Sequence, residues 1–295
     1  MTTSASSFDF RPPERSLIDT IVREALDEDR ASHDVTSRAV IPPEQPGRGV
    51  FLAKAPGVIC GLDAVESAFQ WMSDDLELEV IAGDGSQVEP GTVFAQVHGP
   101  LRPMLGAERV ALNLLQRMSG VATLTRSFVR AAAEGGPARV VDTRKTTPGL
   151  RDLERYAVRV GGGHNHRNTL EDGILLKDNH IAAAALRGLG IAELIEEARS
   201  RSPHTLRVEI EVEDAAGALL AIAANADVIM LDNMSPDEMR GVIEAAPDGI
   251  VFEASGGVNL ETVRAIAATG VDLISVGALT HSAPALDISL EIEPA

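Results

Sequence analysis

The chain has 295 residues, of which 44% are hydrophobic and 24% are charged. This is the composition of a folded globular protein and excludes a disordered chain. The 44 acidic residues outnumber the 26 basic ones and give a formal charge of −18, which would repel nucleic acid and anionic lipid. No apolar run is long enough to span a membrane, and the first residues lack the layout of a signal peptide. We therefore expect a cytoplasmic protein that binds neither nucleic acid nor membranes.

Residues 1–118 are predicted to form a separate α+β domain. Apolar residues at helical spacing predict helices over 16–27 and 62–72. The stretch 81–99 resembles the hairpin of a biotinyl or lipoyl carrier barrel, but a carrier needs a lysine at the hairpin tip and this stretch has none. We therefore keep the hairpin and reject the carrier function. The single cysteine, Cys60, cannot form an intrachain disulfide and is predicted to be a small buried residue.

Residues 119–285 are predicted to form an α/β domain. A helix over 104–133 leads into it, and short runs of strand-forming residues then alternate with amphipathic segments. The runs begin at Arg139, Ile174, Arg207, Asp227, Ile250 and Leu273. Such repeats predict parallel strands and favour an α/β barrel, with an open doubly wound sheet as the alternative. The last segment, 286–295, is expected to return to the first domain as a strand.

Polar residues or glycines follow nearly every predicted strand of this domain. In α/β barrels the active residues lie at the C-terminal ends of the strands, where these residues would meet. A purely structural barrel would not need charges there, because buried unpaired charges are destabilising. The residues in these positions are Asp142, Arg144, Lys145, Lys177, Asp178, Glu211 or Glu213, Asp232, Ser255, Gly256, Gly257, Gly277 and Ala278.

Two features point to an anionic ligand. The loops 253–258 and 275–280 are rich in small residues that let backbone N–H groups approach a phosphate, although their glycines could also serve only as tight turns. The segment 139–180 carries eight Lys or Arg against six Asp or Glu within an acidic chain. A solvated helix with ordinary ion pairs is the alternative explanation. Lysine occurs only three times, and two of these residues, Lys145 and Lys177, lie in this segment.

Two histidines in the same segment are separated by one residue. Metal ligation by His164 and His166 is not favoured, because no third histidine or matching carboxylate follows closely. We expect His166 to donate a hydrogen bond to an anion.

Nine motifs in this order resemble the quinolinate phosphoribosyltransferase family, which acts in NAD synthesis. In the second domain they are DTRKTTPGLR (142–151), GGGHNHR (161–167), LLKDNHI (175–181), VEIEVE (208–213), MLDN (230–233), EASGGV (253–258) and SVGALTHS (275–282). DVTS (34–37) and ERVALNLLQRMSG (108–120) extend the resemblance into the first domain.

The resemblance implies an N-terminal α/β sandwich domain, a C-terminal incomplete TIM-like α/β barrel and a homodimer with shared active sites. It also implies phosphoribosyl transfer from phosphoribosyl pyrophosphate to quinolinate with decarboxylation, giving nicotinate mononucleotide, pyrophosphate and CO₂. Mg²⁺ would bind through the pyrophosphate, with Glu211 and Asp232 as candidate protein ligands.

The resemblance also assigns roles to individual residues. Those expected to bind quinolinate are Arg109, Thr143, Arg144, Arg151, His166, Arg167 and Lys177. Those expected to bind phosphoribosyl pyrophosphate are Lys145, Glu211, Asp232, Ser255, Gly256, Gly257, Val276, Gly277, Ala278 and His281. Within this set Lys145, Glu211 and Asp232 are the expected catalytic residues. The choice of Glu211 over Glu209 or Glu213 stays open, and His164 receives no role.

Three other functions are compatible with parts of the pattern. A Schiff-base aldolase acting on a phosphorylated sugar would use a strand-end lysine such as Lys177 beside a phosphate loop. A relative that uses nicotinate would share the barrel without the dicarboxylate pocket. A non-catalytic metabolite-binding protein would bind the same ligands without turnover.

Overall fold

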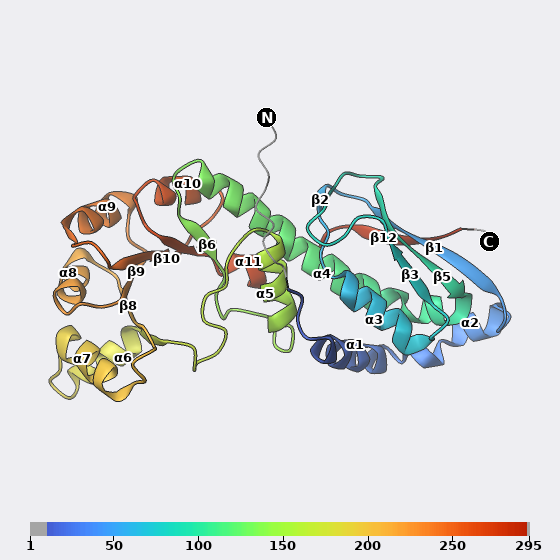
Figure 1. Ribbon diagram of the computed structural model, residues 1–295, viewed down its shortest axis with the longest axis horizontal. Helices are drawn as coiled ribbons and strands as arrows, with labels where there is room; N and C mark the ends of the chain where they lie inside the picture. Colours follow the sequence, from blue (N-terminus) through green and yellow to red (C-terminus); the bar gives the residue numbers. More distant parts are fainter. Residues whose placement is uncertain (1–10, 294–295) are drawn as a thin grey trace. The chain divides into compact units, whose positions relative to one another are not determined.

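The structure is a computed structural model that describes residues 11–293. Residues 1–10, where no signal peptide is expected, and residues 294–295, the end of the predicted last strand, lie outside the described residues. The chain forms two compact units (Figure 1). One comprises Met1–Arg126, Thr146–Gly162 and Ser282–Ala295, and the other Ser127–Lys145 and Gly163–His281. None of the described helices is both long and apolar enough to cross a membrane.

The first unit combines an antiparallel sheet with helices. Its elements are α1 (Arg15–Asp29), the 3-10 helix η1 (Ala31–His33), α2 (Val35–Val40), β1 (Pro46–Ala53), β2 (Gly57–Val58), α3 (Leu62–Met72), β3 (Glu77–Val80), β4 (Gln87–Val88), β5 (Val93–Pro100), most of α4 (Leu101–Ala133), α5 (Arg151–Val160) and β12 (Ile288–Glu293). Its main sheet has the order β12-β1-β5-β3, so the C-terminal segment lies beside β1, with Leu290 opposite Phe51. This is the predicted α/β sandwich.

Aromatic rings join the sheet of the first unit to its helices. The ring of Phe51 on β1 lies 6.1 Å from that of Phe69 on α3 and 6.0 Å from that of Phe94 on β5. All three side chains are almost completely buried, and aromatic pairs at these separations stabilise a core beyond the area they bury. Cys60 is also buried, as predicted.

The predicted hairpin over 81–99 forms only in part: the backbone N–H groups of Ile81 and Ala82 donate to Phe94 O at 2.9 Å, but β4 pairs elsewhere. Within the described residues β4 pairs with β2, whereas β5 pairs with β1 and β3. The backbone N–H of Ile59 donates to Ser86 O, and Gly85 N–H donates to Ile59 O. This pairing with residues 57–59 satisfies the backbone groups that a hairpin would have used.

The second unit is an incomplete α/β barrel. Its elements are β6 (Arg139–Val141), β7 (Ile174–Leu176), α6 (Asp178–Ala185), α7 (Ile191–Arg201), β8 (Val208–Val212), α8 (Ala215–Ala223), β9 (Val228–Asp232), α9 (Pro236–Ala245), β10 (Val251–Ser255), α10 (Val263–Ala267), β11 (Leu273–Ser275) and α11 (Ala278–His281). All six strands are parallel, in the order β6-β11-β10-β9-β8-β7. The last strand pairs with the first as in a barrel, but β6 and β7 do not pair with each other among the described residues.

Local sequence signals explain how the helices of this unit begin. Ser235 is the N-cap of α9, and its hydroxyl accepts a hydrogen bond from the backbone N–H of Glu238. The Glu238 carboxylate accepts from Ser235 N–H in return, and Pro236 occupies the first helical position. This is a capping box with an N-terminal proline. These signals start α9 at Pro236, shortly after β9 ends at Asp232, so only a short loop separates the strand from the helix.

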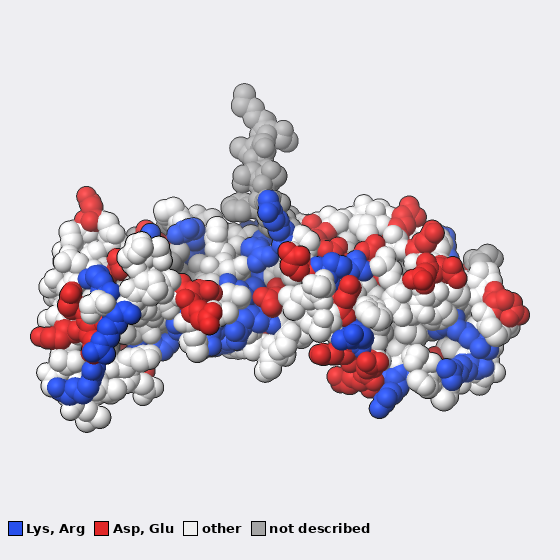
Figure 2. Space-filling view, turned by 60° about the horizontal axis from the view of Figure 1, so that its bottom comes forward, with Lys and Arg blue, Asp and Glu red and all other residues white. Residues whose placement is uncertain are grey.

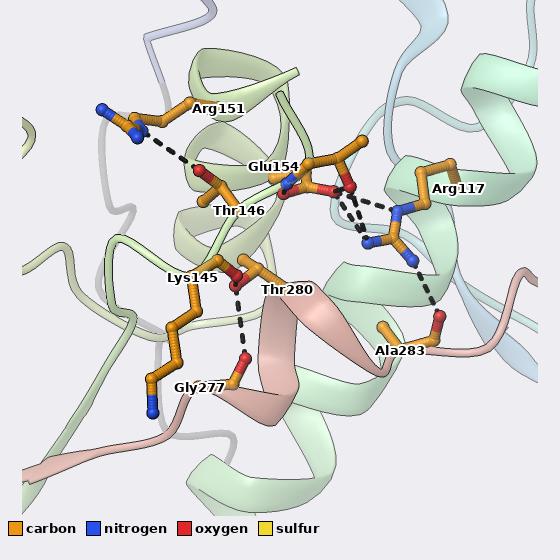
Figure 3. A network of polar contacts seen from close by, with 9 residues as sticks. Arg117, Lys145, Thr146, Arg151, Glu154, Gly277, Thr280 and Ala283 are labelled. Atoms are coloured by element: carbon orange, nitrogen blue, oxygen red, sulfur yellow. Dashed lines mark hydrogen bonds and ion pairs between the residues drawn. The ribbon is translucent and has the colours of Figure 1, made fainter. Parts of the chain in front are cut away.

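The observed units differ from the predicted division of the chain. The predicted boundary at residue 118 falls inside α4, and residues 146–162 belong to the first unit. A buried ion pair is one of the contacts that join them to this unit: Glu154 of α5 is fully buried, and its carboxylate accepts from Arg117 of α4 at 2.7 Å (Figure 3). A buried carboxylate needs such a partner, so α5 is held against α4.

Acidic and basic side chains are interspersed over the face shown in Figure 2. The large negative charge is therefore not gathered into one surface region of this face.

Candidate active site

A cavity of about 380 Å³ opens at the carboxyl ends of the barrel strands. Charged side chains reach it from five of the strands or the loops that follow them. It is lined by Thr143, Arg144, Lys145, His166, Arg167, Leu175, Lys177, Glu211, Met230, Asp232, Glu253, Ser255 and Ser275. We call it the cationic cavity, because five of these thirteen side chains are Arg, Lys or His.

Two arginines of this cavity lie close together. The Nε of Arg144 is buried and has no hydrogen-bond partner among residues 11–293. Burial and the nearby charge of Arg144 lower the pKa of the Arg167 guanidinium. A buried donor without an acceptor and two neighbouring cations are both unfavourable unless a ligand compensates them. The arrangement is suited to an anion.

A buried aspartate holds the loop that carries His166. Asp142 follows β6 and is fully buried. Its carboxylate accepts from the backbone N–H of His166 at 2.9 Å and from Asn165 Nδ2 at 2.5 Å. His164 runs beside β6, where its backbone exchanges hydrogen bonds with Val140 and Asp142. His164 therefore extends the sheet edge through its backbone, and His166 is placed by Asp142.

Lys177 is held by a carboxylate of the next strand. It is the N-cap residue of α6, directly after β7, and its ammonium contacts Glu211 on β8. Schiff-base chemistry requires a free amine, whereas this contact keeps the ammonium in an ion pair. The geometry gives no support to the aldolase alternative.

The three glutamates of the VEIEVE motif lie at different depths along one face of the strand. Glu211 lines the cationic cavity. Glu209 is 7% exposed and lies 3.3 Å from His166. Glu213 is exposed beyond the end of β8. Alternate residues of a strand share a face, so the three glutamates differ only in their position along the strand. Glu211 is the one that lies level with the cationic cavity.

Sequence reasoning missed Glu253. This residue of β10 is completely buried and lines the cationic cavity, and one of its oxygens lies 3.3 Å from His166 Nε2. It stands at the start of a glycine-rich motif, in which the glycines are the more obvious pattern. The signal in the sequence that indicates a site residue is an acidic residue two positions before the end of a strand.

A second cavity, of about 260 Å³, adjoins the first and is lined mainly by small residues. Thr143, Lys145, Ser255 and Ser275 line both cavities. The remaining lining residues are Gly256, Gly257, Val258, Val276, Gly277, Ala278 and His281. We call this the glycine cavity; it brings together the small residues of the two predicted phosphate loops.

Two glycines of this cavity are required by space. Gly256 has φ +83°, and a Cβ there would overlap the side-chain oxygen of Asn233. A Cβ at Gly277 would lie 3.0 Å from Lys145 Cδ and 3.2 Å from His281 Nε2. A side chain at Gly277 would enter the space beside Lys145, whereas one at Gly256 would displace Asn233, so the glycines allow these close approaches.

Lys145 is anchored through its backbone. Its carbonyl accepts from Thr280 Oγ1 at 2.8 Å, and its N–H donates to Thr143 Oγ1 at 3.1 Å. Figure 3 shows the side chain extending away from this anchor. These hydrogen bonds fix the backbone of Lys145, while its ammonium is available to ligands in both cavities.

Asp232 completes the polar wall at the end of β9. It lines the cationic cavity, and its carboxylate accepts from Asn233 Nδ2 at 2.8 Å. Asn233 adopts a left-handed conformation, φ 55°, which asparagine tolerates. This turn presents the aspartate at the strand end.

Two of the sequence-predicted residues belong to the first unit. Arg109 is exposed on α4. Arg151 begins α5, and its Nε donates to Thr146 Oγ1 at 3.0 Å (Figure 3). The other residues predicted to bind either substrate line one or both cavities of the barrel unit.

The sequence matches two family descriptions that together cover most of the chain. "Quinolinate phosphoribosyl transferase, N-terminal domain" matches residues 34–119, and "Quinolinate phosphoribosyl transferase, C-terminal domain" matches residues 121–291. The chain belongs to the quinolinate phosphoribosyltransferase family. This agrees with the resemblance drawn from its motifs.

Individual members of the family are similar over nearly their whole length. The chain is 44% identical to a probable nicotinate-nucleotide pyrophosphorylase [carboxylating] of Bacillus subtilis, over 90% of each chain. It is 39% identical to quinolinate phosphoribosyltransferase [decarboxylating] 1b of Nicotiana tabacum, over 98% of this chain and 87% of the other. The crystal structure of NadC from Streptococcus pyogenes superposes with a TM-score of 0.91 at 37% identity, covering 96% and 99% of the two chains.

Proposed function

We propose that this chain transfers the phosphoribosyl group of phosphoribosyl pyrophosphate to quinolinate and releases CO₂, pyrophosphate and nicotinate mononucleotide. The observation that carries the proposal is the buried, unpartnered Nε of Arg144 in a cationic cavity that adjoins a glycine cavity. A planar dicarboxylate suits the first cavity and a phosphorylated sugar suits the second. Membership of the family supports both assignments.

Quinolinate would bind in the cationic cavity. Arg144 and Arg167 provide guanidinium groups, which can bind a carboxylate through two parallel hydrogen bonds. Lys177, His166 and Thr143 line the same space. A dianion compensates both the unpartnered donor of Arg144 and the mutual repulsion of the two arginines.

Phosphoribosyl pyrophosphate would bind across the glycine cavity. The backbone N–H groups of residues 255–257 and 276–278 can approach its phosphates, because the glycines have no side chains that would cover these groups. Lys145 and His281 also line the glycine cavity and can contribute a positive charge or a hydrogen-bond donor. Lys145 lines both cavities and is therefore suited to the atoms where the two substrates meet.

Mg²⁺ is part of the proposal through the pyrophosphate. Carboxylate oxygens are the protein ligands that Mg²⁺ prefers, and Asp232 and Glu211 are the carboxylates that fit, since both line the cationic cavity. Glu211 already contacts Lys177, so Asp232 is the better candidate. Bound Mg²⁺ would neutralise charge on the leaving pyrophosphate.

The chemistry follows from these positions. The quinolinate nitrogen attacks C1 of the ribose as the bond to pyrophosphate breaks, and positive charge develops on the sugar. Glu211 and Asp232 can stabilise that charge electrostatically. The positive charge of the alkylated ring nitrogen stabilises the electron pair left at the adjacent carbon when CO₂ departs, and a proton from solvent then takes the place of the carboxylate at that carbon to give nicotinate mononucleotide.

The first unit would complete the site in a homodimer. Arg109 is exposed on α4 within the motif that the family resemblance assigns to a neighbouring subunit. Arg109→Ala should therefore be inactive but folded. Mixing it with an inactive Lys145→Ala chain should restore up to about a quarter of the activity, because random pairing leaves one intact site in each mixed dimer. Absence of any restored activity would contradict shared sites.

The decisive experiment is to incubate the protein with quinolinate, phosphoribosyl pyrophosphate and Mg²⁺ and to measure nicotinate mononucleotide and CO₂ together. We expect equal amounts of both products, and none when nicotinate replaces quinolinate. Turnover of nicotinate but not of quinolinate would indicate a different substrate. Absence of product with either compound would contradict the proposal.

A further inference from the structure

Thr280 lies among residues that we assign to a substrate, but it faces neither cavity. It is completely buried in the short helix α11. Ala278 and His281 of the same helix line the glycine cavity, whereas Thr280 lines neither cavity. A ligand in either cavity would therefore not touch Thr280. Any effect of this residue on the reaction must pass through the groups that it contacts.

The hydroxyl of Thr280 reaches two main-chain carbonyl groups (Figure 3). Its Oγ1 lies 2.8 Å from Lys145 O and 3.3 Å from Gly277 O. A hydroxyl has one proton to donate, so the shorter contact, to Lys145, is the main hydrogen bond. The two carbonyl groups belong to the loop after β6 and the turn after β11, and both residues line the glycine cavity. One buried hydroxyl thus joins the two segments.

The hydrogen bond to Lys145 departs from the usual behaviour of a threonine in a helix. A helical threonine commonly donates to the carbonyl three or four residues before it. Thr20 and Thr125 do so, each at 2.8 Å. For Thr280 the equivalent acceptor is Gly277 O, but the hydroxyl lies closer to Lys145, which is 135 residues away in the sequence. The hydroxyl therefore serves a tertiary contact more than the stability of its own helix.

The side chain of Lys145 passes along the same turn. A Cβ built on Gly277 would lie 3.0 Å from Lys145 Cδ and 3.2 Å from His281 Nε2. The stem of the lysine therefore runs close to the glycine backbone and beside the imidazole. Thr280 fixes the backbone end of Lys145, and the turn at Gly277 confines its stem. Two contacts with one short segment, residues 277–281, thus determine the direction in which the ammonium points.

We propose that Thr280 is a positioning residue that places the ammonium of Lys145 where the two substrates meet. Lysine carries its charge at the end of a flexible stem, so a shift of the backbone moves the charge. Stabilisation of a transition state depends on placement to within about 1 Å, whereas quinolinate binding relies mainly on the two arginines of the cationic cavity. Loss of the hydroxyl should therefore lower kcat more than it weakens binding. This inference rests on the proposed function, which defines the reacting atoms.

Two substitutions separate the hydroxyl of Thr280 from the packing of its side chain. Thr280→Val keeps the shape without the donor, and Thr280→Ser keeps the donor without the methyl group. We expect Thr280→Val to lower kcat about tenfold and to change direct binding of quinolinate less than about threefold, with Thr280→Ser close to wild type. Thr125→Val, which removes an equally buried hydroxyl with a local hydrogen bond, is the matched control and should keep the wild-type kcat. A wild-type kcat in Thr280→Val, or an equal loss in Thr280→Ser, would overturn the proposal.

A double-mutant cycle tests whether Thr280 acts through Lys145. In a Lys145→Ala background no ammonium is left to be placed, so adding Thr280→Val should change the residual rate less than about twofold. The release of radiolabelled CO₂ from quinolinate during long incubations measures such slow rates. A damaged fold would instead lower the rate about tenfold in both backgrounds. That result would show that Thr280 acts independently of the lysine and would overturn the proposal.

The contact between Thr280 and Lys145 can also be measured without any ligand. The Lys145 amide donates to Thr143 Oγ1 at 3.1 Å, and its hydrogen exchange, followed by NMR, reports opening of the loop after β6. Exchange should become about tenfold faster in Thr280→Val but not in Thr280→Ser or Thr125→Val. Unchanged exchange in Thr280→Val would overturn the inference and leave the proposed function intact. Faster exchange in that variant, together with no turnover by the wild-type protein, would overturn the proposed function and with it the catalytic role of the contact.

Discussion

The two cavities of the barrel unit are built by different means. The cationic cavity is formed largely by long side chains, and two of its residues are held by another group: His166 through its backbone N–H by Asp142, and Lys177 by Glu211. The glycine cavity is lined mainly by small residues, and its shape depends on the absence of side chains at Gly256 and Gly277. One cavity therefore selects by charge and the other by close approach of main-chain donors. Substitutions should affect the two substrates separately, except where a residue lines both.

Among the substitutions that distinguish the two cavities, the largest effect is expected from Arg144→Ala. This change removes the guanidinium with the unpartnered Nε that we assign to a quinolinate carboxylate, and loss of one partner of a buried charge pair costs about 2–5 kcal/mol. The kcat/KM for quinolinate should fall roughly 10²–10³-fold, whereas the affinity for phosphoribosyl pyrophosphate, measured by direct binding, should change less than threefold.

Arg240→Ala is the matched control for that experiment. Arg240 is on α9, where it pairs with Asp237 at the surface, and exposed pairs contribute little. An equal loss of affinity for both substrates in Arg144→Ala would show that the cationic cavity is not selective for quinolinate.

Lys145→Arg should affect both substrates at once. Lys145 lines both cavities, and its Cδ lies close to where a side chain at Gly277 would begin. A guanidinium is planar and larger than an ammonium, so it cannot occupy the same space. We expect kcat to fall about 10–100-fold, equivalent to about 1.4–2.7 kcal/mol, with the fold unchanged by circular dichroism. Near-normal steady-state kinetics would contradict a requirement for the compact ammonium.

The comparison also explains which parts of the site the sequence could predict. Strand-end residues such as Lys177 and Asp232 were predicted because parallel strands bring their carboxyl ends together whatever their exact packing. The alternation in VEIEVE places Glu209, Glu211 and Glu213 on one face but does not give their depth. Glu211 reaches the cavity while Glu209 meets His166, and this distinction needs the register of the whole sheet.

Long-range polar pairs account for the rest. Glu154 joins α5 to α4 through Arg117, two residues far apart in sequence, so the grouping of residues 146–162 with the first unit had no local signal. Glu253 was missed for a similar reason, since its importance arises from His166, which a different segment provides. The sequence can show that a charged residue lies within an otherwise apolar segment and is therefore expected to be buried. Its partner, however, is determined by the tertiary structure.

The smallest effect is expected from Gly256→Ala, which tests the glycine cavity. An alanine Cβ would overlap the side chain of Asn233 and would require φ +83°, which L-residues rarely adopt; such strain costs about 1–3 kcal/mol. The loop should move, so the KM for phosphoribosyl pyrophosphate should rise about tenfold while quinolinate affinity, measured by direct binding, stays within threefold. Gly241→Ala is the control, because a Cβ on that helical glycine meets no atom within 4 Å and should be neutral or slightly stabilising. If Gly256→Ala instead weakened only quinolinate binding, the assignment of the two substrates to the two cavities would have to be exchanged.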